Sequence, residues 1–339
     1  MKLLSRRRDE TGAPEADDSR PLPDEAPEPQ PELDEPRLQD PAPTDLSKRD
    51  YVAILKRAFK RSNEDHITSL AAALAYYAFL SIPAILLIAA GVFGLVAGPD
   101  AITTIIDKLN GIVPSQASSL LQGSLRRLTQ QQGTSITLIA VGGLLALWSV
   151  SGAMQNVMWA LNLAYDREET RGFVRRRLVA AAMAVFALVA SALALGLLVL
   201  GPHLSGWIGD AIGYKTATEI VWWAAQWPIL IGGLLIAFGV IYYLGPDVRQ
   251  KWQFLSFGAV FAVIVWLIAS GAFAFYTSRF SSYNKAWGSL SAVVVMLTWL
   301  WISSVALLLG AEINAEAERS RELREGEPAE VELQAPAKA

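Results

Sequence analysis

The chain of 339 residues has no cysteine and only two histidines, His66 and His203. Without cysteine there is no disulfide framework, no thiolate nucleophile and no zinc–sulfur site. Metal-dependent hydrolysis needs several His, Asp and Glu ligands that converge on one or two ions, and two distant histidines do not supply them. The common hydrolase and nucleotide-binding motifs are missing as well. We therefore expect no catalytic residue, no metal site and no cofactor.

Charge is also scarce, because six long stretches contain no Asp, Glu, Lys or Arg. A bilayer core is about 30 Å thick, so a helix needs about 20 apolar residues to cross it. Charged residues make up 18% of the chain, compared with about 25% in a soluble domain. The sequence therefore predicts an all-α, polytopic membrane protein with a bundle of six transmembrane helices. The expected helices span about 67–97, 134–151, 178–203, 220–244, 252–276 and 288–312.

The two ends of the chain have a different composition. Residues 1–47 hold nine of the 17 prolines and no aromatic residue, which predicts a disordered, acidic, Pro-rich tail. Residues 319–339 are predicted to be a second disordered tail, so the transmembrane domain covers 48–318. Amphipathic helices are expected at the membrane interface. One is residues 50–61, whose apolar face and four Lys or Arg residues suit an anionic membrane surface, with a nucleic-acid patch as the weaker alternative.

Two more interfacial helices are expected beside the spans. Residues 151–165 continue the second apolar stretch past one crossing, and we expect them to form a separate helix at the cytoplasmic boundary. Residues 102–128 carry apolar side chains at helical spacing in an outer loop.

The segments outside the spans hold sixteen Lys and Arg residues on one side of the membrane and six on the other. Because basic residues mark the cytoplasmic side, both termini are predicted to be cytoplasmic.

Several polar or helix-breaking residues lie inside or beside the predicted spans. Pro83 predicts a kink that either lines a substrate cavity or serves packing alone. Glu312 is costly if it faces lipid, so it either pairs with a basic residue such as Arg175 or Arg249 or carries a proton in a coupled cycle. Ala306/Gly310 and Ala192/Gly196 have the four-residue spacing of close helix contacts.

The loop before the last span is dense in hydrogen-bonding groups. Its residues Tyr283, Asn284 and Lys285 could bind an anionic head group. The alternative is a simple turn in which Gly288 and Ser289 begin the last helix.

Five pieces of this sequence together resemble the YihY/BrkB family of bacterial inner-membrane proteins. They are Ala73-Leu-Ala-Tyr-Tyr77 with Pro83, Ala160-Leu-Asn-Leu-Ala-Tyr165, Tyr242-Tyr-Leu-Gly-Pro246, Tyr283-Asn-Lys-Ala-Trp-Gly-Ser-Leu290 and Gly310-Ala-Glu-Ile-Asn314. Trp287 stands where the family more often has Tyr. The resemblance covers about residues 48–318 and implies six transmembrane helices in the bacterial cytoplasmic (inner) membrane. The candidate substrate or gating residues are Pro83, Tyr76, Tyr283, Asn284, Lys285, Ser289, Glu312 and Asn314, and the candidate cytoplasmic boundary residues are Asn162 and Pro246.

The family that this sequence resembles has no well-established activity. Some members carry an old ribonuclease label (ribonuclease BN), and others are linked to serum resistance or to envelope lipid export. We reject the ribonuclease label, because no metal site and no soluble domain that could hold RNA is evident, and we expect no nucleic-acid partner. The leading hypothesis is a transporter or flippase for a lipid or lipid-like envelope substrate, with membrane lipids as partners. The alternative is a non-transporting membrane scaffold for envelope or regulatory proteins. The sequence sets no oligomeric state.

Overall fold

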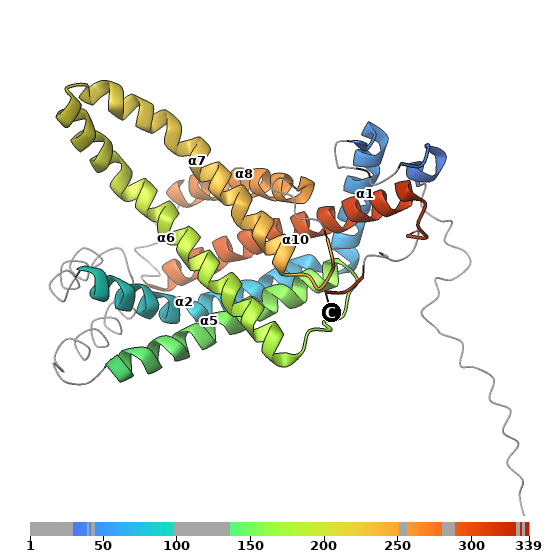
Figure 1. Ribbon diagram of the computed structural model, residues 1–339, viewed down its shortest axis with the longest axis horizontal. Helices are drawn as coiled ribbons and strands as arrows, with labels where there is room; N and C mark the ends of the chain where they lie inside the picture. Colours follow the sequence, from blue (N-terminus) through green and yellow to red (C-terminus); the bar gives the residue numbers. More distant parts are fainter. Residues whose placement is uncertain are drawn as a thin grey trace, which may run out of the picture.

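The structure is a computed structural model that describes residues 30–38, 41, 45–97, 136–250, 256–279, 289–329, 333 and 336–338. Every regular element within these residues is a helix (Figure 1). The elements are η1 (Pro31–Asp34), α1 (Lys48–Glu64), α2 (Ile67–Ala97), α5 (Ile136–Ala164), α6 (Phe173–Ile212), α7 (Lys215–Leu244), α8 (Phe257–Arg279) and α10 (Ser289–Glu325). Each of the helices from α2 to α10 contains a stretch long and apolar enough to cross a membrane. The predicted all-α fold with six spans is confirmed.

The six long helices form a ring that follows the order of the chain. Each helix from α2 to α8 packs against the next described helix, and α10 packs back against α2. Such an arrangement is the usual result when consecutive elements are neighbours in space. The α6–α7 connection is the shortest, and Gly213 ends α6 there with φ +78°, a left-handed conformation that glycine adopts at no steric cost.

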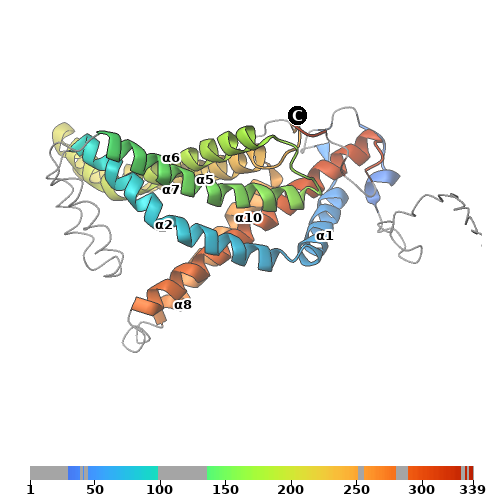
Figure 2. The same ribbon diagram turned by 90° about the horizontal axis from the view of Figure 1, so that it is seen from below.

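The ring is tight at one end and splayed at the other. Figures 1 and 2 show the pairs α2–α5, α6–α7 and α8–α10 diverging from a common region beside α1. Burial follows the same division, since the buried residues of α8 are confined to 258–263 and the described side chains of α10 are buried only from Ala306 onward. We call the convergent region, which includes α1 and the C-terminal part of α10, the closed end. The opposite halves of the three pairs form the splayed end.

Two glycines allow α8 and α10 to touch at the closed end. A Cβ atom on Gly258 would lie 2.0 Å from the Gly310 carbonyl oxygen, and one on Gly310 would lie 2.2 Å from the Tyr242 hydroxyl oxygen. That hydroxyl donates a hydrogen bond to the Leu307 carbonyl oxygen at 2.8 Å. The close helix contact expected at Gly310 is therefore present, whereas a Cβ on Gly196 would meet nothing within 4 Å.

Helix α1 packs on the protein through its apolar face. Its first turn is fixed by a capping box, in which the Ser47 hydroxyl accepts from the Asp50 N–H and the Asp50 carboxylate accepts from the Ser47 N–H. Ile54 and Ala58 are fully buried against α10 near Ile313. The apolar face predicted to lie on a membrane is thus largely used for packing. On the basic face Lys56 and Lys60 are exposed, whereas Arg57 is buried.

Several helices run beyond the predicted spans. Helix α5 continues unbroken to Ala164, so the expected separate interfacial helix is part of α5. Helix α6 begins at Phe173 and α10 ends at Glu325. The prediction of disorder is wrong for residues 319–325, which belong to α10, and for η1. Charged side chains end a membrane span but are good helix formers, so the charge pattern locates spans rather than helix ends. The helices expected within 102–128 lie outside the described residues.

Candidate functional site

The closed end contains a buried charge cluster centred on Arg57 of α1. Arg57 Nε lies 2.7 Å from Glu316 Oε2, and Arg57 Nη2 lies 2.9 Å from Glu32 Oε1. The Ser320 hydroxyl accepts from Arg57 Nη2 at 2.7 Å and donates to Glu32 Oε1 at 2.6 Å. Arg57 is 6% exposed and each carboxylate 1%. These four residues, which we call the Arg57 cluster, join η1, α1 and α10.

Both members of the Glu32–Arg57 pair are held in their charged forms. Burial on its own raises the pKa of Glu32 and lowers that of Arg57, because the charged form loses water. The hydrogen bonds and opposite charges outweigh burial, so the pKa of Glu32 is lowered and that of Arg57 is raised. Removing one partner would strand the other charge in a buried place.

Glu316 also connects this cluster to two further arginines. Glu316 Oε1 lies 3.1 Å from Arg61 Nε and 3.2 Å from Arg319 Nη1. Asp166, in the turn after α5, pairs with Arg61 and lies 3.5 Å from Arg319 Nη2. Asp166 has φ 49°, a left-handed conformation that Asp tolerates better than most residues. Three separate parts of the chain are therefore tied together by charge at the closed end.

Glu312, one turn before Glu316 on α10, meets Asp65 at the C-terminus of α1. Glu312 is 1% exposed. Asp65 Oδ2 and Glu312 Oε2 are buried and have no hydrogen-bond partner among the described residues, and the two carboxyl groups are close enough to interact electrostatically. Two buried carboxylates side by side repel each other, which favours a proton on one of them. Burial is the largest cause that raises the pKa of Asp65, and the Asp166 carboxylate adds to it. We call Asp65 and Glu312 the acid pair.

Asn162 and Pro246, the predicted boundary residues, lie in a second polar junction between the α5–α6 connection and the end of α7. Asn162 Oδ1 accepts from the Asp247 N–H at 2.6 Å. Asp247 Oδ2 accepts from the backbone N–H and the hydroxyl of Thr170, at 2.9 and 2.5 Å. Arg171 donates to two carbonyl oxygens at the end of α7, at 3.1 and 2.7 Å. The junction fastens α5 and the α5–α6 connection to the end of α7 at the closed end.

This junction predicts a pH dependence of stability. Burial alone raises the pKa of Asp247, but the Thr170 hydrogen bonds and the Arg171 charge outweigh it and lower the pKa from its ordinary 3.8. A carboxyl with a lowered pKa stabilises the fold above its ordinary pKa, and this contribution is lost as the pH falls through the folded pKa. We expect the thermal midpoint in detergent to fall as the pH drops below the ordinary pKa of 3.8. Asp247→Asn should reduce that fall while lowering the midpoint at neutral pH. Asp210→Asn, at the exposed α6–α7 tip, is the control; an unchanged acid profile in Asp247→Asn would contradict the assignment.

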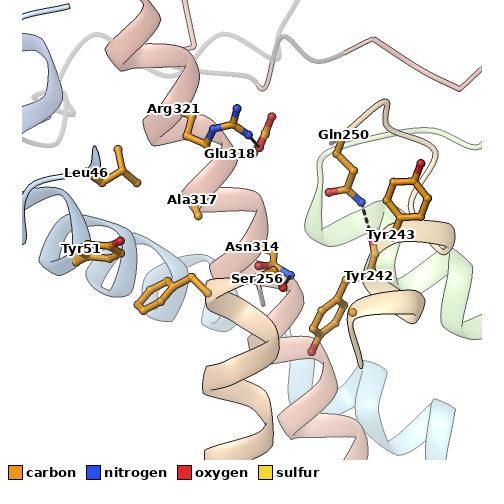
Figure 3. Close-up of a pocket in the computed structure, with 12 residues that line it drawn as sticks. Leu46, Tyr51, Tyr242, Tyr243, Gln250, Ser256, Asn314, Ala317, Glu318 and Arg321 are labelled. Atoms are coloured by element: carbon orange, nitrogen blue, oxygen red, sulfur yellow. Dashed lines mark hydrogen bonds and ion pairs between the residues drawn. The ribbon is translucent and has the colours of Figure 1, made fainter. Parts of the chain in front are cut away.

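Asn314 lies at a small cavity at the closed end (Figure 3). Its Oδ1 accepts from the Gly258 N–H at 2.8 Å, and its Nδ2 donates to the Ser256 hydroxyl at 3.1 Å. The cavity measures about 40 Å³, room for about three or four water molecules at roughly 10–15 Å³ each. It is too small for a lipid head group, so the contacts of Asn314 are those of a residue that joins α8 to α10.

The other predicted site residues are not brought to this region. Tyr76 is 55% exposed on α2, with its ring 5.7 Å from that of Tyr77. Pro83 lies farther along α2 at an exposed position, and the helix continues through it. Ser289 is the first residue of α10. Tyr283, Asn284 and Lys285 lie outside the described residues.

Sequence reasoning identified Glu312 but not its neighbours. The basic partners suggested for it were Arg175 and Arg249, whereas its contact is Asp65 and the nearby cation is Arg61. One pattern could have revealed the site: Glu312, Glu316 and Ser320 repeat every four residues, which places them on one face if the last helix continues. Within the described part of the chain, no group of three or more His, Asp and Glu side chains is placed to hold a metal ion.

Comparison with known proteins shows extensive similarity along the chain. A family model described as "Virulence factor BrkB" matches residues 58–334. YfkH of Bacillus subtilis, whose name calls it ribonuclease-like, is 30% identical over 278 residues, which cover 82% of this chain and 99% of that protein. A UPF0761 membrane protein of Alteromonas mediterranea is 25% identical over 274 residues, which cover 80% of this chain and 89% of that protein. No solved structure matches.

Proposed function

Since the chain belongs to the BrkB family of membrane proteins, we propose that it is a transporter for a lipid or lipid-like amphiphile. The observation that carries this proposal is the shape of the ring. Three helix pairs separate at the splayed end and expose large apolar side chains, while buried charges hold them together at the closed end. A bundle with one closed and one open end is what alternating access requires of one of its two states.

The proposal includes an orientation in the bacterial inner membrane. Among the described residues, the closed end carries most of the Lys and Arg side chains, including those of α1 and the α5–α6 connection, whereas Lys215 and Arg279 lie at the splayed end. Basic loops remain on the cytoplasmic side. The closed end then faces the cytoplasm, with both termini, and the splayed end lies in the outer half of the bilayer.

The experiment for this function uses purified protein in vesicles that contain a head-group-labelled phospholipid. We expect the label to redistribute between leaflets faster than in protein-free vesicles. Redistribution that is no faster than in protein-free vesicles would overturn the proposal. In the same preparation, metal-dependent cleavage of added RNA would overturn our proposal that the protein is not an enzyme.

The acid pair is the proposed coupling site, because moving its proton would leave two buried carboxylates in contact. We expect Glu312→Gln to slow redistribution and to remove its dependence on a pH gradient, since the amide keeps the volume but not the proton. Glu318→Gln, on the same helix and paired with Arg321, is the matched control.

Infrared spectroscopy tests whether the acid pair holds a proton: a protonated-carboxyl band should be present in the parent and absent from Glu312→Gln. If lipid redistribution depends on the pH gradient equally in the parent, Glu312→Gln and Glu318→Gln, the coupling role is contradicted.

One observation favours the alternative, a membrane scaffold. Residues beside η1 form part of the closed end, where the Leu38 N–H donates to the Arg324 carbonyl oxygen at 2.8 Å and Glu35 pairs with Arg324 at 3.0 Å. A partner could recognise that composite surface. A scaffold predicts no lipid redistribution by the full-length protein in vesicles, and loss of the cellular phenotype when residues 1–38 are deleted although the protein still inserts into the membrane.

A further inference from the structure

A hollow runs along the exposed face of α1 at the closed end. Its volume is about 490 Å³, and α1 forms most of its wall, with Pro31 of η1 contributing from the side. This volume lies within the range of small-molecule binding sites. The hollow is separate from the Asn314 cavity and from the acid pair. Lys48, Val52 and Lys56 recur every four residues along it, so they share one helical face.

The hollow has an excess of positive charge. Lys48, Arg49 and Lys56 are exposed, and none of them makes a side-chain hydrogen bond or ion pair with another described residue. Arg57 also borders the hollow, but its charge is matched by Glu32 and Glu316. Three cations with no acidic partner on one helical face repel one another. A bound anion would relieve that repulsion.

Apolar surface lies between these cations. Val52 is 66% exposed at the wall of the hollow, next to Ala53 and Pro31. An anion without an apolar part would leave this surface in water, whereas an amphiphile with a charged head would cover both kinds of surface. The position of α1 suits such a ligand, because only Asp65 and His66 separate it from the first span, α2. Figure 1 shows α1 lying crosswise to the long helices at the closed end, and amphipathic helices beside a span commonly lie at the depth of lipid head groups.

We infer that this hollow binds the phosphate head group of an anionic phospholipid, with Lys48, Arg49 and Lys56 around the phosphate and Val52 and Ala53 against the adjoining glycerol and acyl carbons. Lysine and arginine supply charge-assisted hydrogen bonds to phosphate oxygens, and arginine can do so through two parallel N–H groups. The site would serve a transporter and a scaffold equally, so it does not depend on the proposed transport activity.

The test compares lipid retention by the purified full-length protein in a neutral detergent, measured by native mass spectrometry. We expect phosphatidylglycerol to be retained in preference to phosphatidylcholine. Removing a juxtamembrane cation weakens binding about fivefold, so Lys48→Gln with Lys56→Gln should weaken it by about 25-fold. Lys60→Gln is the matched control, because Lys60 lies on the same helix, outside the hollow, and pairs with Glu64 at 3.8 Å.

A second variant keeps the test informative if lipid binds elsewhere on the protein. Val52→Glu places a carboxylate at the wall of the hollow without disturbing buried packing, and it should abolish the preference for phosphatidylglycerol. Equal retention of the two lipids by the parent, or an equal loss in Lys60→Gln, would overturn the inference. So would glycerol phosphate that binds as tightly as the intact lipid, since the apolar wall would then contribute nothing.

Discussion

Arg57→Ala is expected to destabilise the protein by about 3 kcal/mol, the lower end of the cost of removing one partner from a buried ion pair. The change strands the Glu32 carboxylate, which keeps only the Ser320 hydroxyl from the Arg57 cluster. The Glu316 carboxylate keeps two ion-pair partners, Arg61 and Arg319. The measurement is the thermal unfolding midpoint of the purified protein in detergent, which should fall by several degrees.

Two companion variants separate charge from geometry in this prediction. Arg57→Lys keeps the charge but loses the planar guanidinium that reaches two carboxylates at once, so it should be intermediate. Adding Glu32→Gln to Arg57→Ala should recover part of the loss, because the stranded group is then neutral. If Arg57→Ala unfolds at the temperature of the parent, the Arg57 cluster does not hold the closed end together.

Gly310→Val is expected to cause the second large loss, of at least about 1–3 kcal/mol from overpacking. Its Cβ would lie 2.2 Å from the Tyr242 hydroxyl and 2.6 Å from the Ala262 Cβ. Helices α8 and α10 would have to separate, and Tyr242 would lose its hydrogen bond to α10. The thermal midpoint and the yield of monodisperse protein are the readouts.

Gly196→Val is the matched control, because the same added side chain meets open space on α6. We expect its effect to stay within about 0.5 kcal/mol, as for a substitution away from packed features. Equal losses in the two variants would mean that the α8–α10 approach is not a stabilising contact.

These two glycines also show what the sequence could predict. The four-residue spacing predicted a close helix contact for both Ala192/Gly196 and Ala306/Gly310. Only the second pair lies at a tight helix crossing. Small residues permit a close approach but do not say which helix face will meet a neighbour. The six spans were predictable because the lack of charge is a local property of each stretch. Helix pairing and the splayed end depend on contacts across the whole ring.

The candidate site was predictable in part for the same reason. Glu312 was recognised because an acid at the edge of a span is unusual, and Asn162 and Pro246 came from the family resemblance. Their partners could not be found from local pattern. Arg57 and Glu316 are 259 residues apart, and Glu32 lies in a Pro-rich acidic segment in which no feature distinguishes it from its neighbours. The acid pair needed the end of α1 and the middle of α10 to be placed together.

The proposed transport activity requires the closed end to open, and the absence of native cysteine makes this directly testable. Ala58→Cys and Ile313→Cys place thiols in the buried contact between α1 and α10. A control pair, Gly206→Cys and Glu219→Cys, joins α6 to α7 within one arm, where a Cβ on Gly206 would lie 3.6 Å from the Glu219 carboxylate. Labelled-lipid redistribution should stop when the first pair is cross-linked and resume on reduction, while the control cross-link leaves it unchanged. Redistribution at the same rate in the cross-linked and reduced forms of the first pair would contradict the account.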